Sequence, residues 1–212
     1  MAMRTRLGGL GLVLAGITGG WVHYHYFDET RKQQIREIEA KIKYPCCEDV
    51  PSVESLKHST WYCVATVNEP WYQKRVREIA VKMDDVGDNG KLRASWSATA
   101  IVHKGTRKQI GFHVEKQQDS EGRPIYTCTL PTGMNDKIFK SDKVIIDAGN
   151  HGFNQWVIFH DRKQPERLRV YADTPILSDA AWSTIAQTIE NQGYDLDALT
   201  RAPQTTTNTD ST

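Results

Sequence analysis

Apolar and polar residues alternate with a period of two over much of the chain between residues 61 and 173. Leu92, Ala94 and Trp96, for example, share one side of an extended segment, and Arg93 and Ser95 share the other. This alternation is typical of a strand with one buried face. Eight such segments follow one another, at residues 61–66, 77–83, 92–102, 109–115, 125–130, 143–148, 155–160 and 168–173.

Turn-forming residues separate these segments, and no helical pattern interrupts them. Asn89-Gly90 is a strong hairpin signal because both residues readily adopt the positive φ that tight hairpin turns require. Evenly spaced strands of this kind are typical of an antiparallel sandwich or barrel. Eight strands also suffice to close an up-and-down barrel that can hold one small ligand. The sequence therefore predicts an all-β, eight-stranded antiparallel up-and-down barrel.

The period becomes helical on either side of the strand region. Before it, Ile35, Ile38 and Ile42 share one face of a predicted helix over residues 28–43, which Tyr44-Pro45 ends. Two interpretations are open. The helix is either a solvated stalk that leans on the barrel or a docking element for a partner or a membrane surface.

After the strands, one C-terminal α-helix is predicted to run to about residue 192. Ser178 is its expected N-cap and Gly193 its expected stop. Ala181, Ile185 and Ile189 form its expected buried stripe. Residues 202–212 contain almost only polar residues and proline, so we expect a disordered tail there.

An uncharged apolar run at residues 7–22 follows Arg4 and Arg6. As a helix it spans roughly 24 Å, less than a hydrocarbon core of about 30 Å, although Trp21 and Tyr24 could extend it. It is interpreted as an uncleaved anchor, a cleaved secretory signal or a mitochondrial presequence. The early arginines then place the barrel on the non-cytoplasmic side (periplasm or secretory lumen), or at the mitochondrial inner membrane.

Four regions follow from these patterns. They are a signal or transmembrane anchor at 1–27, a helical connector at 28–52, the barrel with its C-terminal helix at 53–201, and the tail at 202–212.

Charge argues against one broad class of partner. The 212 residues include 27 basic and 26 acidic ones, for a formal net charge of +1. Nucleic-acid-binding domains usually carry a basic face, so we expect no nucleic-acid partner.

The chemistry-bearing residues form no recognisable constellation. Seven histidines are scattered, and the four cysteines fit no zinc-binding spacing. We therefore predict no catalytic residues, no metal site, no cofactor and no enzyme activity. Cys46 or Cys47 either pairs with Cys63 or Cys128 in a disulfide or stays a free thiol.

Both ends of the strand region carry motifs that resemble those of lipocalins of the bacterial and apolipoprotein D type. The opening motif Gly-x-Trp-Tyr-x-x-Ala is similar to Ser59-Thr60-Trp61-Tyr62-Cys63-Val64-Ala65. The closing motif is similar to Asp173-Thr174-Pro175-Ile176-Leu177-Ser178-Asp179, followed by Gly193-Tyr194-Asp195. The resemblance covers residues 53–199 and implies a lipocalin barrel with one C-terminal helix.

The resemblance also implies that Trp61 lies at the base of the barrel. Two positions depart from the family pattern, because Ser59 replaces the motif glycine and Asp173 replaces the arginine that stacks on the tryptophan. Arg169 or Arg75 could supply that contact, or the lead-in at residues 44–53 could close the base instead.

The resemblance implies that the barrel interior is the functional surface. The predicted ligand-binding residues are Ile79, Val81, Trp96, Phe112, Val114, Tyr126 and Tyr171. Ala98, Cys128 and Ile146 are also expected to point inward. We predict a membrane-tethered protein that binds or transports a small hydrophobic ligand such as a fatty acid, lysolipid or isoprenoid.

Two alternatives stay open. Bulky rings such as Trp96, Phe112, Tyr126 and Trp156 could fill the barrel and leave no cavity. The barrel could also serve as a structural accessory subunit of a membrane protein complex, docked to its partners through residues 28–43.

Overall fold

The computed structural model describes residues 29–52, 54–69, 76–87, 91–100, 106–129, 140–152 and 154–202. The predicted N-terminal segment at 1–27, the Asn89-Gly90 turn and the tail beyond residue 202 lie outside these residues, so those predictions stay predictions. No helix among the described segments is both long and apolar enough to cross a bilayer.

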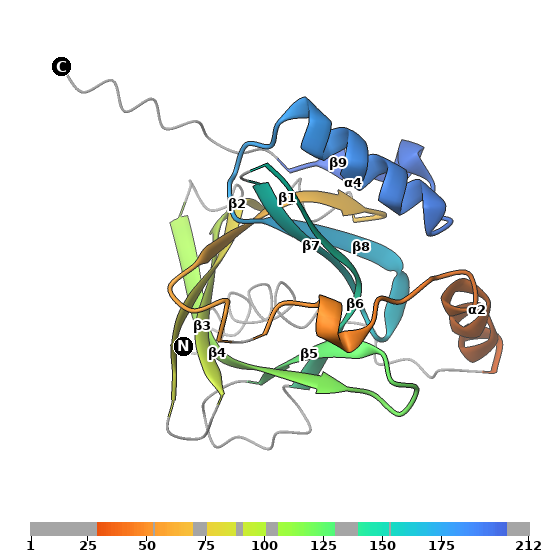
Figure 1. The fold of residues 1–212 in the computed structure, drawn as a ribbon, viewed down its shortest axis with the longest axis horizontal. Helices are drawn as coiled ribbons and strands as arrows, with labels where there is room; N and C mark the ends of the chain where they lie inside the picture. The colour runs from red at the N-terminus through yellow and green to blue at the C-terminus, as the bar shows by residue number, and fades with distance from the viewer. Residues whose placement is uncertain are drawn as a thin grey trace, which may run out of the picture.

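Eight antiparallel strands form a closed up-and-down barrel, as predicted (Figure 1). Each strand pairs with the next in sequence, and β1 pairs with both β8 and β2, which closes the ring. Closure leaves no open sheet edge among these eight strands. The strands are β1 Thr60–Val67, β2 Val76–Val86, β3 Leu92–Ala100, β4 Thr106–Gln118, β5 Pro124–Thr129, β6 Lys140–His151, β7 Asn154–Asp161 and β8 Gln164–Ala172.

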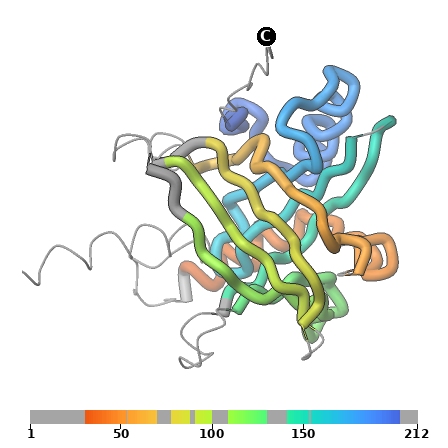
Figure 2. Tube along the Cα trace, turned by 90° about the vertical axis from the view of Figure 1, so that its left-hand side faces the viewer, coloured from red at the N-terminus to blue at the C-terminus, as the bar shows by residue number. Residues whose placement is uncertain are grey.

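Helix α4 (Asp179–Asn191) lies outside the barrel, as Figure 2 shows. Its start is the predicted one, because the Ser178 side chain accepts a hydrogen bond from the backbone N–H of Ala181. Gly193 follows with φ of +82°, a conformation that glycine adopts without steric cost. The predicted stripe of Ala181, Ile185 and Ile189 is fully buried.

Helix α2 (Glu29–Glu39) ends earlier than the predicted residue 43. A turn at Ala40 and Lys41 replaces the expected last helical turn, and Ile42 then inserts into the core beside α4. Arg31 pairs with Glu166 of β8 at 2.8 Å, and Glu39 pairs with Arg123 at 3.2 Å. The helix therefore leans on its own barrel, as the stalk interpretation expected.

The strands separate two apolar cores. The inner core fills the barrel and contains most of the residues predicted to point inward. The outer core lies between the barrel wall and α4. Short irregularities in the strands decide which core a side chain enters, and they overturn two predicted orientations.

The first irregularity lies in β1. Its register against β8 shifts between Cys63 and Ala65, so Trp61 and Cys63 face the inner core while Ala65 faces the outer one. Strict alternation along residues 61–66 predicts that Ala65 shares the face of Trp61. That prediction was wrong, because a β-bulge inserts one residue and reverses the alternation beyond it.

A second shift, between Ile145 and Asp147 in β6, has the same effect. Ile145 is in the inner core, and Ile146, predicted to point inward, is in the outer core.

A ninth strand, β9 (Leu199–Arg201), was not predicted. It pairs antiparallel with Ala65, Thr66 and Val67 of β1 after a short turn of 3₁₀ helix, η3 (Leu196–Ala198). Residues 199–201 are thereby attached to the first strand of the barrel.

Candidate functional site: a cavity in the barrel

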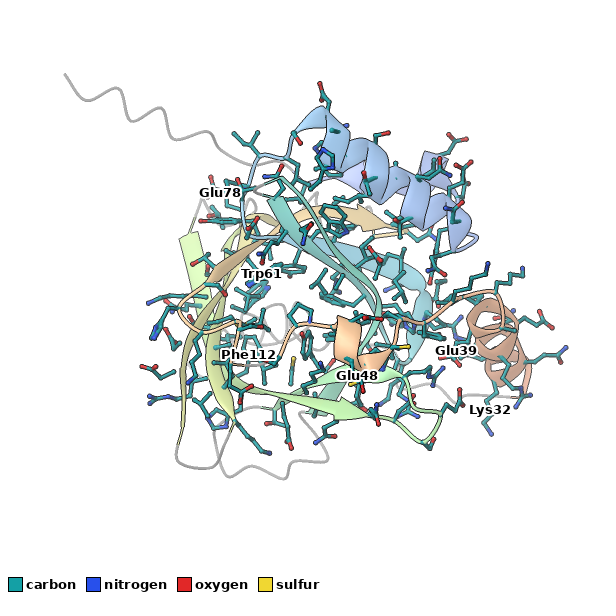
Figure 3. The ribbon with its side chains drawn as sticks, in the orientation of Figure 1. Lys32, Glu39, Glu48, Trp61, Glu78 and Phe112 are labelled. Atoms are coloured by element: carbon teal, nitrogen blue, oxygen red, sulfur yellow. The ribbon has the colours of Figure 1, made fainter. Side chains whose placement is uncertain are left out.

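A cavity of about 90 Å³ lies inside the barrel. Its wall is almost entirely apolar, and it draws on all eight barrel strands and on Leu56, which precedes β1. The lining residues are Leu56, Trp61, Val81, Met83, Trp96, Phe112, Val114, Tyr126, Cys128, Lys143, Val157, Phe159, Arg169 and Tyr171. Figure 3 shows Trp61 and Phe112 projecting into the ring of strands.

The structure gathers most of the predicted ligand-binding residues in this wall. Those that line it are Val81, Trp96, Phe112, Val114, Tyr126 and Tyr171, together with the predicted base residue Trp61. Ile79 lies in the inner core but not among the lining residues. Their contact with a ligand stays a prediction, but these residues do line the same cavity.

Large rings do not fill the barrel completely. Trp156, one of the four rings expected to do so, lies in the outer core. Its ring lies against Gly149, where an added Cβ would be 2.6 Å from Cζ2. Trp156 alternates with Val157, which lines the cavity, so its indole lies outside the barrel. Only Trp96, Phe112 and Tyr126 of this group line the interior.

Several lining residues were missed from the sequence. Val157 and Phe159 alternate within a predicted strand, so the period-two pattern could have identified them. Leu56 precedes the first strand and has no such pattern. Lys143 and Arg169 are charged residues, which are rarely expected inside a barrel.

The lead-in before β1 closes one mouth of the barrel, as the departures from the lipocalin motif suggested. Val50 and Leu56 belong to the inner core. Lys116 Nζ donates to the carbonyl oxygens of Cys47 (2.6 Å) and Val50 (2.5 Å). The short helix η1 (Cys47–Asp49) thereby lies across the ring of strands (Figure 1).

Ser59, which replaces the family glycine, has a role that glycine could not fill. Its hydroxyl accepts a hydrogen bond of 2.8 Å from Trp61 Nε1 and donates to the carbonyl of Leu56. The base tryptophan is therefore held by the lead-in. Arg75 lies outside the described residues.

Both cations in the cavity wall are paired with carboxylates. Arg169 donates two hydrogen bonds to Glu69, of 3.0 and 2.8 Å. Lys143 Nζ donates to Asp161 at 2.9 Å. Burial alone would raise the pKa of Asp161, but the Lys143 ammonium and the hydrogen bonds from Lys143 and Lys163 lower it below its ordinary value. Asp161 is therefore charged at neutral pH and forms an ion pair with the Lys143 ammonium.

All four cysteines are free thiols, so the disulfide alternative does not hold in this structure. Burial raises the pKa of the cavity thiol Cys128 to about 11, with the Lys143 charge partly opposing it. The thiol is therefore protonated at neutral pH and contributes an apolar surface rather than a nucleophile. Within the described segments, no group of three or more histidine, cysteine or acidic side chains is arranged to hold a metal ion.

Trp96 carries the one buried side-chain polar atom without a hydrogen-bond partner in the described part of the chain, its indole Nε1. The residue is 3% exposed and lines the cavity.

Among the solved structures that resemble this fold are the following three. Insecticyanin from the tobacco hornworm Manduca sexta has a TM-score of 0.52 at 10% identity, with 74% of this chain and 82% of that chain covered. The allergen Per a 4 from cockroaches has a TM-score of 0.51 at 12% identity, covering 72% and 88%. Apocrustacyanin C1 has a TM-score of 0.51 at 14% identity, covering 78% and 92%.

All three are lipocalins, and the closed eight-stranded barrel followed by one helix is the lipocalin architecture. At these identities the likeness extends to the fold alone, so the resemblance to the bacterial and apolipoprotein D type stays a prediction. No protein-family model matches the sequence, and no curated protein matches it.

Proposed function

We propose that the protein binds a compact, mostly apolar molecule inside its barrel. The observation that carries this proposal is the cavity, which combines apolar walls from every barrel strand with a few fixed polar groups. Small-molecule sites in proteins are typically built in this way.

The volume of the cavity limits the ligand. Sites for drug-sized ligands measure about 300–1,000 Å³, whereas this cavity measures about 90 Å³. A fatty acid, lysolipid or isoprenoid would therefore enter only if side chains of the wall moved. Without such movement, the space suits a molecule about the size of one small ring, comparable to the benzene that fills an engineered apolar cavity of about 150 Å³.

The accessory-subunit alternative gains no specific support from helix α2. Ile38 packs against the outer core, and Arg31 and Glu39 form ion pairs with the barrel. Part of the surface that could have bound a partner is therefore used within the chain.

Two neighbouring residues of β7 provide a matched test. Val157 lines the cavity, whereas Ile158 is fully buried in the outer core. We expect Val157→Phe to fill the cavity and to weaken binding of methylenecyclopentane at least about tenfold, because the new ring takes up the space of a small-ring ligand. Ile158→Phe should destabilise the fold by about 1–3 kcal/mol through overpacking but leave binding unchanged.

Binding would be followed through amide chemical shifts during titration. If Val157→Phe binds methylenecyclopentane as tightly as the wild type does, the cavity is not the site.

A further inference from the structure

The buried tryptophans of this chain differ in how their indole N–H groups are satisfied. Trp61 Nε1 donates to Ser59 Oγ at 2.8 Å, and Trp156 Nε1 donates to Asp147 at 3.0 Å. Trp96 Nε1 is equally buried but has no partner among the described residues. Buried polar groups are normally paired, because an unpaired one costs about 1–3 kcal/mol. The exception lies in the wall of the cavity.

The fold holds the Trp96 indole at this position. The residue lies in the middle of β3, opposite Val81 of β2 and Ile110 of β4. Ala94 and Ala98 flank it on the same face and are almost fully buried. These small neighbours leave room for the large ring between them, so the indole is fixed by packing while its N–H stays unpaired.

The charged groups of the cavity restrict what could pair with this N–H. Arg169 is already bonded to Glu69, and Lys143 to Asp161. A carboxylate ligand would have to compete with these internal carboxylates and would lose its hydration in an apolar space, which is costly for an unpaired charge. A neutral acceptor avoids both costs and still satisfies the indole.

We propose that the ligand carries a neutral hydrogen-bond acceptor, such as a carbonyl oxygen, that accepts a hydrogen bond from Trp96 Nε1. The ligand class is then a compact ketone, aldehyde, ester or amide rather than a free carboxylic acid or a pure hydrocarbon. This inference rests on the proposed ligand-binding function and specifies its chemistry.

Three probes of similar size test the proposal on the full chain. They are cyclopentanone, its hydrocarbon counterpart methylenecyclopentane, and the anion cyclobutanecarboxylate. Each is titrated into the wild type and into Trp96→Phe, which keeps an aromatic ring but removes the N–H. We expect Trp96→Phe to weaken cyclopentanone binding about 2- to 10-fold, as for the loss of one hydrogen bond, and to change methylenecyclopentane binding less than about twofold. The carboxylate should bind the wild type more weakly than the ketone.

A second measurement does not depend on the variant being folded. In the wild type, cyclopentanone should move the indole N–H proton resonance of Trp96 downfield, and methylenecyclopentane should not.

The other outcomes overturn the proposal at different levels. Equal losses for ketone and hydrocarbon would show that Trp96 acts only through its ring. A carboxylate that binds most tightly, with no effect of Trp96→Phe, would identify an anion site. Both results would leave the proposed function intact, whereas failure of all three probes to bind the wild type would remove the proposed function and this inference together.

Discussion

His160 in β7 is fully buried, and its ring lies against Tyr44, which follows helix α2. Its Nδ1 lies 3.1 Å from the carbonyl oxygen of Asp161, and its Nε2 lies 3.4 Å from the hydroxyl of Tyr44. Because a carbonyl can only accept, Nδ1 carries the proton, and the neutral ring accepts from Tyr44 through Nε2. Burial lowers the pKa of His160 to about 4, although its contacts with Asp161 partly oppose this shift.

This buried histidine makes stability depend on pH. The unfolded chain protonates near the ordinary pKa of 6.5 and the folded chain only near about 4, so the unfolded state takes up the proton first as the pH falls. The stabilising contribution of neutral His160 is therefore complete above about pH 6.5 and is lost as the pH approaches 4. The loss amounts to at most about 3 kcal/mol.

Urea unfolding between pH 4 and pH 8 measures this effect. His160→Gln cannot titrate, so the difference in unfolding free energy between wild type and variant should narrow toward pH 4. Other titrating groups change the unfolding free energies of both proteins equally, so their contributions cancel in the difference. Parallel curves over the whole range would mean that His160 titrates normally in the folded protein.

At the scale of elements, the lead-in that closes the barrel mouth depends on few contacts. Lys116 bonds two of its carbonyls, and the hydroxyl of Tyr126 donates to the carbonyl of Pro51 at 2.6 Å. Hydrogen bonds to a charged group contribute about 1.5–3 kcal/mol each. We therefore expect Lys116→Met to speed amide hydrogen exchange in residues 47–52 by about tenfold or more while the strands stay protected.

Lys91→Met is the matched control, because Lys91 also pairs with a strand residue, Glu115, but on the exposed surface. It should leave exchange in residues 47–52 unchanged. If both variants behave alike, Lys116 does not hold the lead-in in place.

The order and type of these elements could largely be predicted from the sequence, because their signals are local. Alternation predicted all eight strands, and Ser178 and Gly193 predicted both ends of α4. The β-bulges that turned Ala65 and Ile146 outward have no comparable signal, since one extra residue leaves the composition of a strand unchanged. Strand β9 is three residues long and exists through its pairing with β1.

The residues of the cavity also divide into those with a local sequence signal and those without one. Its apolar wall followed from alternation, whereas its charged members depend on partners that are distant in sequence. Glu69 and Arg169 are 100 residues apart in the sequence, so no local sequence pattern predicts that they pair. The unpaired N–H of Trp96 is likewise a property of the folded barrel and not of the residues that surround it in sequence.

At the scale of the whole molecule, the barrel wall divides two cores that have different roles. The outer core consists of buried side chains that join α4 and the connector to the strands. The inner core contains the cavity and its fixed polar groups. The proposed function requires that the inner core bind a ligand and that the outer core bind none.

Intermolecular nuclear Overhauser effects between bound cyclopentanone and valine methyl groups test this claim most directly. Val114 and Val157 line the cavity, and Val64 and Val170 belong to the outer core. We expect saturable effects to Val114 and Val157 and none to Val64 and Val170. Effects to Val64 and Val170 without any to Val114 and Val157 would contradict this claim.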